Sequence, residues 1–282
     1  MMSSTVPILL YHSVSDTSSE RFRPWTVSRQ AFDEQMRHLR DNQYTPLAVT
    51  QFVQAVETGA IHAIEHPVVI TFDDGFADFY TDAYPILGKY ACPATIYIVT
   101  GYVGQTSRWL AREGEGGRPM MTWEHIAEIS AGGIECGGHT HHHPQLDLVS
   151  PATARDEIAR SKAELEQHLG AAVASFAYPH GYHTRVVREM VIESGYTSAC
   201  AVKHALSSPH DDRFALGRII ITRDTTLSEL DAWLQGERLP VAQVAERVQT
   251  RVWRMVRRSR KKMEAAFTFI DREQFNTGTS DH

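Results

Sequence analysis

Two adjacent aspartates, Asp73 and Asp74, end an apolar run and are followed at once by Gly75. Neighbouring side chains on a regular strand point to opposite faces, so both carboxylates can serve one site only if the chain turns sharply, as glycine permits. Two ionised carboxylates this close repel each other unless a cation lies nearby. The pair therefore indicates either a metal site or an ordinary turn in which Asp74 caps the next helix and Asp73 is solvated.

A histidine-rich segment, GGHTHHHP at residues 137–144, ends a second apolar run. Two imidazoles and one carboxylate form a ligand set that divalent metals accept, with positions left open for water and substrate. Alone, the segment is equally compatible with a surface turn. Together with the aspartate pair at another strand end, it predicts a hydrolytic metal site.

Short apolar runs alternate with helical periodicity along most of the chain. The predicted strands are 6–12, 67–74, 94–100, 133–140, 173–179, 196–202 and 217–222. The predicted helices are 28–41, 50–58, 77–90, 122–131, 151–169, 184–194 and 226–235. This alternation predicts βα crossovers and a parallel sheet, and about seven such units favour a barrel over an open sheet. The residues singled out above fall at C-terminal strand ends, where such barrels carry their chemistry.

Three segments resemble the motifs of the polysaccharide deacetylase family, also called the NodB-homology domain. They are TFDDG (71–75), HTHHHP (139–144) and FAYPHG (176–181), and their order and spacing also match. The resemblance covers residues 5–236. It implies a distorted (β/α)7 barrel, which agrees with the strands predicted from the pattern.

Carried over by position, the resemblance implies roles for individual residues. Asp74, His139 and His143 would bind one divalent metal. Zinc is the first choice, and cobalt, nickel and iron are the alternatives. Asp73 would be the general base. His141 and His142 would not be ligands, because they occupy variable positions of the motif.

The third motif implies groove residues and also shows a departure. Tyr178 and Pro179 would line the groove, with the Tyr178 backbone amide as a candidate oxyanion donor. The arginine that many members carry in this motif is replaced here by Ala177. From their placement, Arg218 or Arg223 could supply the missing guanidinium.

The family's C-terminal LxH motif, whose histidine is the general acid, is also missing from its usual place. The motif occurs instead at the N-terminus as Leu10-Tyr11-His12. The resemblance is therefore to a circularly permuted branch, since the termini of a barrel lie close together. It makes His12 the general acid, with Asp224 as a weaker candidate to orient it.

The implied function is hydrolysis of an N-acetyl group on an amino sugar, in a glycan or a glycan precursor. Asp73 would take a proton from metal-activated water, and His12 would protonate the departing nitrogen. Two other functions stay open. One is cleavage of O-acetyl esters or other small amides at the same site, and the other is a glycan-binding module without turnover.

Composition and termini add further expectations. The net charge of −6 gives no basic field for nucleic acid, and the three dispersed cysteines suggest buried free thiols. No signal peptide or membrane span is evident, so we expect a cytoplasmic protein. Residues 237–270 predict a basic amphipathic helix and 271–282 a disordered tail. The helix either packs on the barrel or contacts an anionic membrane at the inner face through 247–262, where eight Lys/Arg fall.

Overall fold

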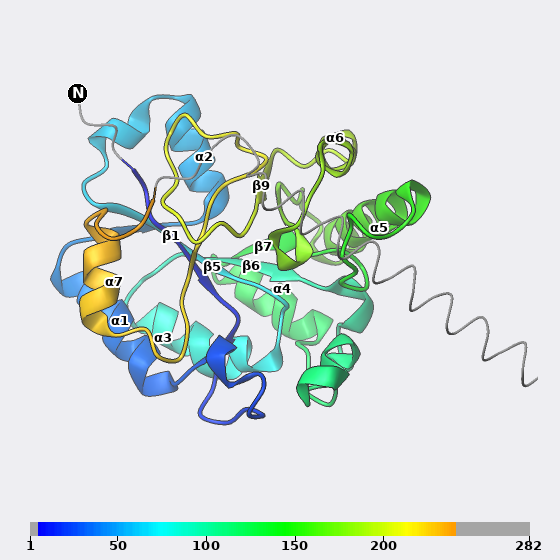
Figure 1. The fold of residues 1–282 in the computed structure, drawn as a ribbon, viewed down its shortest axis with the longest axis horizontal. Helices are drawn as coiled ribbons and strands as arrows, with labels where there is room; N and C mark the ends of the chain where they lie inside the picture. The colour runs from blue at the N-terminus through cyan, green and yellow to red at the C-terminus, as the bar shows by residue number, and fades with distance from the viewer. Residues whose placement is uncertain (1–4, 241–282) are drawn as a thin grey trace, which may run out of the picture.

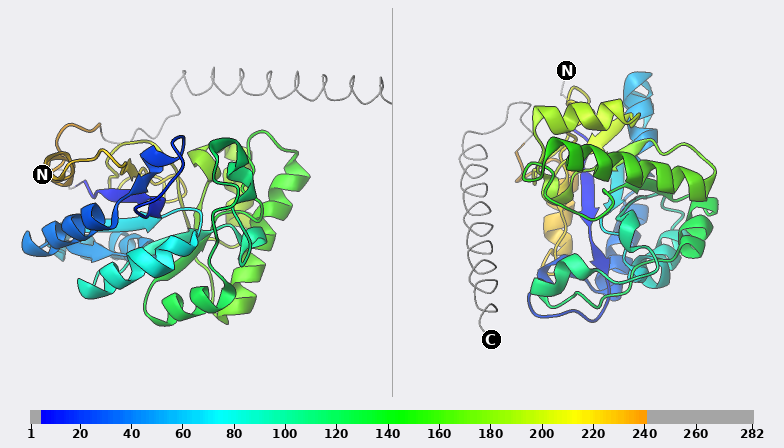
Figure 2. Two further views of the ribbon diagram at one scale, coloured as in Figure 1. Left: turned by 90° about the horizontal axis from the view of Figure 1, so that it is seen from below. Right: turned by 90° about the vertical axis from the view of Figure 1, so that its right-hand side faces the viewer.

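The computed structural model describes residues 5–240. Its strands are β1 (Ile8–Tyr11), β2 (Ser13–Val14), β3 (Thr26–Val27), β4 (Thr45–Leu47), β5 (Pro67–Phe72), β6 (Thr95–Ile98), β7 (Glu135–Gly138), β8 (Ser175–Ala177), β9 (Ser198–Cys200) and β10 (Ile219–Ile220). Its α-helices are α1 (Arg29–Asp41), α2 (Val49–Glu57), α3 (Tyr84–Lys89), α4 (Trp123–Ala131), α5 (Pro151–Leu169), α6 (Arg185–Glu193) and α7 (Leu227–Leu234). Helices surround a curled sheet (Figure 1, Figure 2).

The sheet is parallel and runs in the order β10-β1-β5-β6-β7-β8-β9. Its two edges approach each other through a parallel bridge between Cys200 and Leu216. This is the distorted (β/α)7 barrel that the sequence predicts, and all seven predicted strands are confirmed. Among residues 5–240, no helix is long and apolar enough to cross a membrane.

Alternate strand residues enter two different buried clusters. On β5, Val68 and Ile70 belong to the larger cluster, whereas Val69 between them packs with Tyr97 and Leu216 in a second cluster. This period of two is the alternation expected of a strand that is covered on both faces. Thr71 and Asp73 continue the face of Val69, so the strand itself directs Asp73 toward the second cluster.

Three local features were not predicted. Strand β4, which contains Pro46 and pairs only with the first half of β5, lies off the main path of the sheet. Strands β2 and β3 form a separate two-stranded sheet. The predicted helix 77–90 divides into a π-helical turn at Phe79–Ala83 and α3, because Pro85 has no N–H to continue the regular hydrogen-bond pattern.

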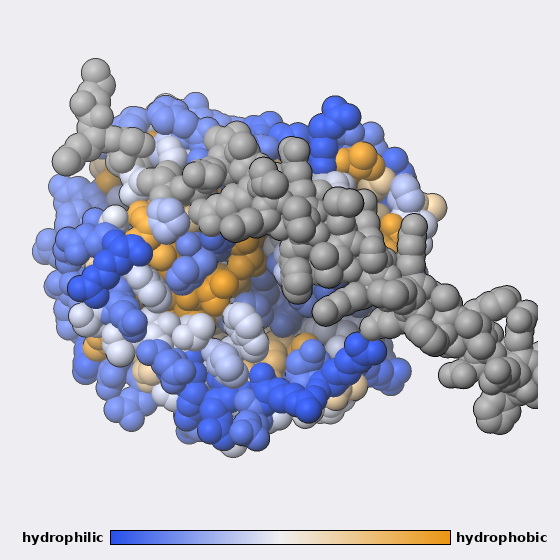
Figure 3. All heavy atoms as spheres, viewed as in Figure 1, coloured by the Kyte–Doolittle hydropathy of each residue, from blue (hydrophilic) through white to orange (hydrophobic). Residues whose placement is uncertain are grey.

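Most of the predicted C-terminal extension lies outside the described residues. Residues 237–240, at its start, form no helix. The predicted helix, its basic segment 247–262 and the tail 271–282 therefore stay predictions. On the face seen in Figure 1, the described surface is mainly hydrophilic, with apolar side chains gathered near the middle (Figure 3).

Candidate active site

Strand register brings the predicted site residues together. In the pairing of β1 with β5, Tyr11 lies opposite Phe72, so His12 and Asp73 leave the sheet side by side. In the pairing of β6 with β7, Ile98 lies opposite Gly138, and the Ile98 carbonyl accepts a hydrogen bond from the His139 amide. Strands β1, β5 and β7 thus deliver the site's first residues to one end of the barrel.

The chain turns sharply after β5, as the glycine suggested. Asp74 and Gly75 both adopt positive φ angles, 79° and 84°. A left-handed backbone is unusual for aspartate and is tolerated when the surroundings hold it. The turn lets both carboxylates face one site, because Asp73 Oδ2 and Asp74 Oδ1 lie 3.8 and 3.6 Å from the same atom, His139 Nε2.

Asp74, His139 and His143 are buried and form a group able to hold a metal ion, with their ligand atoms all within 4.8 Å of one another. The Asp74 Oδ1 lies 3.6 Å from His139 Nε2 and 3.4 Å from His143 Nε2. The His139 Nδ1 lies 2.8 Å from the Ala177 carbonyl oxygen, an interaction that places the ring proton there and leaves Nε2 with its lone pair toward Asp74. Two nitrogens and one carboxylate oxygen facing one point fit a divalent metal.

The electrostatics of this group favour a cation. Burial, and then the neighbouring Asp73, raise the pKa of Asp74 well above its ordinary value. Burial also lowers the pKa values of both histidines, so their imidazoles are neutral, the form that binds metals. A cation would offset the cost of a buried carboxylate and use both neutral ligands.

Arg218 replaces the missing arginine of the third motif. Its guanidinium donates to both carboxylate oxygens of Asp73, at 2.6 and 2.7 Å, and also to the Ala201 carbonyl. Burial raises the pKa of Asp73, but the charged Arg218 guanidinium and its hydrogen bonds outweigh burial and hold that pKa below its ordinary value. Asp73 is therefore ionised and fixed in orientation, as a general base must be.

The alternatives for the arginine and for the partner of His12 are wrong. Arg223 and Asp224 are both exposed. Neither side chain has a hydrogen bond or ion pair to Asp73 or His12 among the residues that the structure describes. The turn after β10 carries them outward, and the Arg223 backbone amide is bound to the Pro24 carbonyl.

His12 lies beside Asp73 and is partly exposed. Its ring packs against Trp25, with ring centres 5.3 Å apart, and its Nδ1 has no hydrogen-bond partner within residues 5–240. Burial lowers the pKa of His12 to about 4, although Asp73 acts in the opposite direction. His12 is thus neutral in the free site and has a ring nitrogen available.

The prediction for the Tyr178 amide is wrong. The hydrogen bonds between β8 and β9 continue one residue past β8, so the Tyr178 N–H donates to the Cys200 carbonyl at 3.1 Å. Its hydroxyl donates to the Phe214 carbonyl, and the ring is fully buried. Pro179 is also buried and begins a short turn to Gly181.

The other two histidines of the second motif face away from the ligand group. His141 Nδ1 lies 3.1 Å from the Glu164 carboxylate, and His142 Nδ1 lies 2.8 Å from that of Glu157. Both glutamates belong to α5. At the two variable positions, His141 and His142 therefore attach the motif loop to α5.

Three aromatic side chains at the site were missed from the sequence. The rings of His180 and Trp109 lie 4.9 and 5.2 Å from that of His143, and Trp25 lies against His12. His180 follows the motif proline and has a positive φ of 56°, so its place in the third motif was a usable signal. Trp25 and Trp109 come from the short 3-10 helices Arg23–Trp25 and Arg108–Glu113, and only the fold brings them to the site.

This fold and site agree with one class of protein. The polysaccharide deacetylase family model matches residues 61–199. The chain is therefore similar to polysaccharide deacetylases, as its motifs predicted, and this similarity supports an enzyme of the deacetylase class. The matched segment contains Asp73, Asp74, His139 and His143, whereas His12 and Arg218 lie outside it.

Three individual proteins illustrate the similarity. The chain is 28% identical over 231 residues to YxkH of Bacillus subtilis, which is named a putative polysaccharide deacetylase. That similarity covers 82% of this chain and 76% of YxkH. It is 25% identical over 226 residues to a poly-β-1,6-N-acetyl-D-glucosamine N-deacetylase of Staphylococcus aureus, covering 77% and 75%. The Streptococcus pyogenes deacetylase PplD, solved with acetate, superposes with a TM-score of 0.70 at 27% identity, covering 81% and 97%.

Proposed function

We propose that this enzyme removes N-acetyl groups from an amino sugar in a glycan or glycan precursor by metal-dependent hydrolysis. The observation that carries the proposal is the buried Asp73–Arg218 pair beside the group of Asp74, His139 and His143. An ionised, oriented carboxylate next to a metal-ligand set is the arrangement that hydrolysis by activated water needs. The S. aureus relative is named for an N-deacetylase reaction on a polymer of N-acetylglucosamine.

The metal's contribution is limited and specific. A divalent ion held by Asp74, His139 and His143 would polarise the acyl oxygen and lower the pKa of water to about 7. We propose zinc, because two imidazoles and a carboxylate with open positions are typical of catalytic zinc sites. Metal analysis of the purified protein tests this choice.

Asp73 would act as the general base. Its carboxylate is ionised at neutral pH because Arg218 holds its pKa low, so it can accept a proton from the attacking water. Arg218 also prevents rotation of the carboxylate by binding both oxygens. The base is therefore preorganised before substrate binds.

His12 would act as the general acid toward the departing nitrogen. The imidazole is neutral in the free site, so it must gain a proton after substrate binds. Negative charge that develops on the oxygen of the tetrahedral intermediate raises the pKa of a neighbouring imidazole, and the proton that Asp73 takes from water supplies the one that His12 needs. Protonation matters because an amine leaves poorly without it.

The test is acetate release from defined N-acetylated sugars, as monomers, oligomers and lipid-linked forms, with metal analysis of the same preparation. We expect acetate from at least one N-acetylated sugar, and an inactive Asp73→Asn variant. Release from O-acetyl esters alone would instead establish an esterase. Binding of a glycan without acetate release, unchanged in Asp73→Asn, would establish a binding module.

A further inference from the structure

The side of the site on which a sugar ring must lie follows from the chemistry of the leaving group. This step rests on the proposed function. The bond that breaks joins the acyl carbon to the nitrogen, and that nitrogen stays attached to the sugar. Because His12 protonates this nitrogen, the sugar ring has to lie on the His12 side, while the acetyl group faces the metal ligands.

Trp25 occupies that side. Its ring centre lies 5.3 Å from that of His12, at an interplanar angle of 57°. With 36% of its surface accessible, Trp25 is the largest of the exposed hydrophobic side chains in the part of the chain that the structure describes. A tryptophan that contacts a site residue with one part of its ring and is open elsewhere can offer apolar surface to a ligand.

The loop that carries Trp25 is fixed at both ends. Strands β2 and β3 pair Ser13 with Thr26 and close the loop between them. The Trp25 amide donates to the Phe22 carbonyl, and the Pro24 carbonyl accepts from the Arg223 amide. Trp25 is therefore held by backbone contacts on each side.

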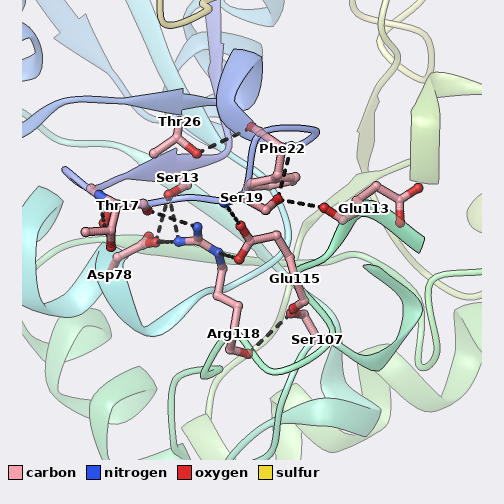
Figure 4. Close-up of polar contacts among 11 residues, drawn as sticks. Ser13, Thr17, Ser19, Phe22, Thr26, Asp78, Ser107, Glu113, Glu115 and Arg118 are labelled. Carbon is pink, nitrogen blue, oxygen red and sulfur yellow. Dashed lines mark hydrogen bonds and ion pairs between the residues drawn. The ribbon is translucent and has the colours of Figure 1, made fainter. Parts of the chain in front are cut away.

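A buried ionic network anchors the rest of the loop (Figure 4). The Arg118 guanidinium binds the Asp78 carboxylate at 2.7 Å and that of Glu115 at 3.0 Å. It also donates to the Ser13 hydroxyl and the Thr17 carbonyl.

Two further contacts complete this anchoring. The Glu115 carboxylate accepts from the Ser19 amide, and the Ser19 hydroxyl donates to the Glu113 carbonyl. The Arg118 guanidinium also lies over the Phe22 ring, 5.2 Å from its centre. So many contacts preorganise the loop, which lowers the entropic cost of binding at Trp25.

We propose that Trp25 is a substrate-positioning residue, against whose exposed ring the amino-sugar ring packs while its nitrogen points to His12. The ligand class is a pyranose with an apolar face of C–H groups. This contact selects acetylated sugars over acetyl groups that are attached to small flexible alcohols or amines.

The test compares Trp25→Ala and Trp25→Phe with the wild type, on an N-acetylated sugar oligomer and on an acyclic acetate ester such as ethyl acetate. For Trp25→Ala we expect KM for the oligomer to rise about five- to tenfold, the scale of an aromatic packing contact. Turnover of the acyclic ester should fall much less than that of the oligomer, and Trp25→Phe should recover most of the loss. Trp123→Ala, which removes a tryptophan stacked on His168 outside the site, is the matched control and should leave KM unchanged.

The outcomes separate the two proposals. A wild type that releases no acetate from any N-acetylated sugar overturns the proposed function. An active wild type whose KM for the oligomer is unchanged in Trp25→Ala overturns the role of Trp25. Equal losses on the oligomer and the acyclic ester also overturn that role, because they indicate damage to the site as a whole.

Discussion

Arg218 binds Asp73 across β1, the strand that lies between β10 and β5 in the sheet. The residue that orients Asp73 thus comes from the end of the barrel sequence, 145 residues from Asp73 along the chain. The motif position that many family members fill with arginine is Ala177, at the end of β8. Arg218 and Asp73 are both buried, so each depends on the other for its charge.

Arg218→Met is expected to lower the free energy of unfolding by about 3–5 kcal/mol, because it leaves a buried carboxylate unpaired. Denaturant unfolding measures this loss. The double variant Arg218→Met/Asp73→Asn should be clearly more stable than the single variant, since no buried charge is left over. Equal stability of the single and double variants would show that the ion pair does not govern Asp73.

His12→Ala is expected to lower turnover of an N-acetylated sugar by about two to four orders of magnitude, the usual scale for a general acid. Metal content should not change, because His12 is not in the ligand group. An O-acetylated substrate should lose much less, since an alkoxide leaves more readily than an amide nitrogen. Loss of metal from this variant would mean that His12 is a ligand.

Asp78 predicts a pH dependence of stability. Burial raises the pKa of Asp78 from 3.8 to about 6, despite its ion pair with Arg118. The folded state therefore binds this proton more tightly than the unfolded state. The associated stability is fully present below about pH 4, is lost as pH rises to about 6, and amounts to about 3 kcal/mol.

The measurement is urea unfolding from pH 4 to 7 for the wild type and Asp78→Asn. The wild type should lose stability relative to the variant as pH rises through this window. Asp156→Asn, at an exposed position on α5, is the control and should run parallel to the wild type. If stability also changed with pH in Asp78→Asn as it does in the wild type, the Asp78 carboxylate would not be the source of the pH dependence.

Gly137→Ala tests how β7 places His139. A Cβ at residue 137 would lie 2.6 Å from the Tyr97 ring and 2.8 Å from the Ser175 carbonyl oxygen. We expect a loss of about 1–3 kcal/mol in stability and weaker metal binding, because the strand must shift. Gly88→Ala in α3, where nothing lies within 4 Å, should instead be neutral or stabilising by about 0.5–1 kcal/mol. Wild-type stability in Gly137→Ala would contradict the packing.

The sequence predicted those parts of the site that sit at strand ends. Asp73, Asp74 and His139 follow directly from apolar runs, and strand register then brings them together. Arg218 and Arg223 could not be separated, because only the path of the chain after β10 buries one and exposes the other. Trp25 was not predicted, because its contact with His12 depends on the path of the loop between β2 and β3.

The error at Tyr178 has a different cause. Whether a backbone amide at a strand end is hydrogen-bonded depends on how far the neighbouring strand extends. Here the Tyr178 amide donates to the Cys200 carbonyl, which extends the pairing of β8 with β9 by one residue. No side-chain pattern carries that information. Strand β4 was missed for a similar reason, because Pro46 argues against a strand in the sequence although this segment pairs briefly with β5.

Metal-dependent hydrolysis with Asp73 as the base is tested most directly by comparing the wild type and Asp73→Asn in metal content and acetate release from one N-acetylated sugar. We expect stoichiometric metal in both proteins, because Asp74, His139 and His143 are intact, and acetate from the wild type alone. Acetate release by Asp73→Asn at the wild-type rate, or a wild type that turns over without bound metal, would contradict this mechanism.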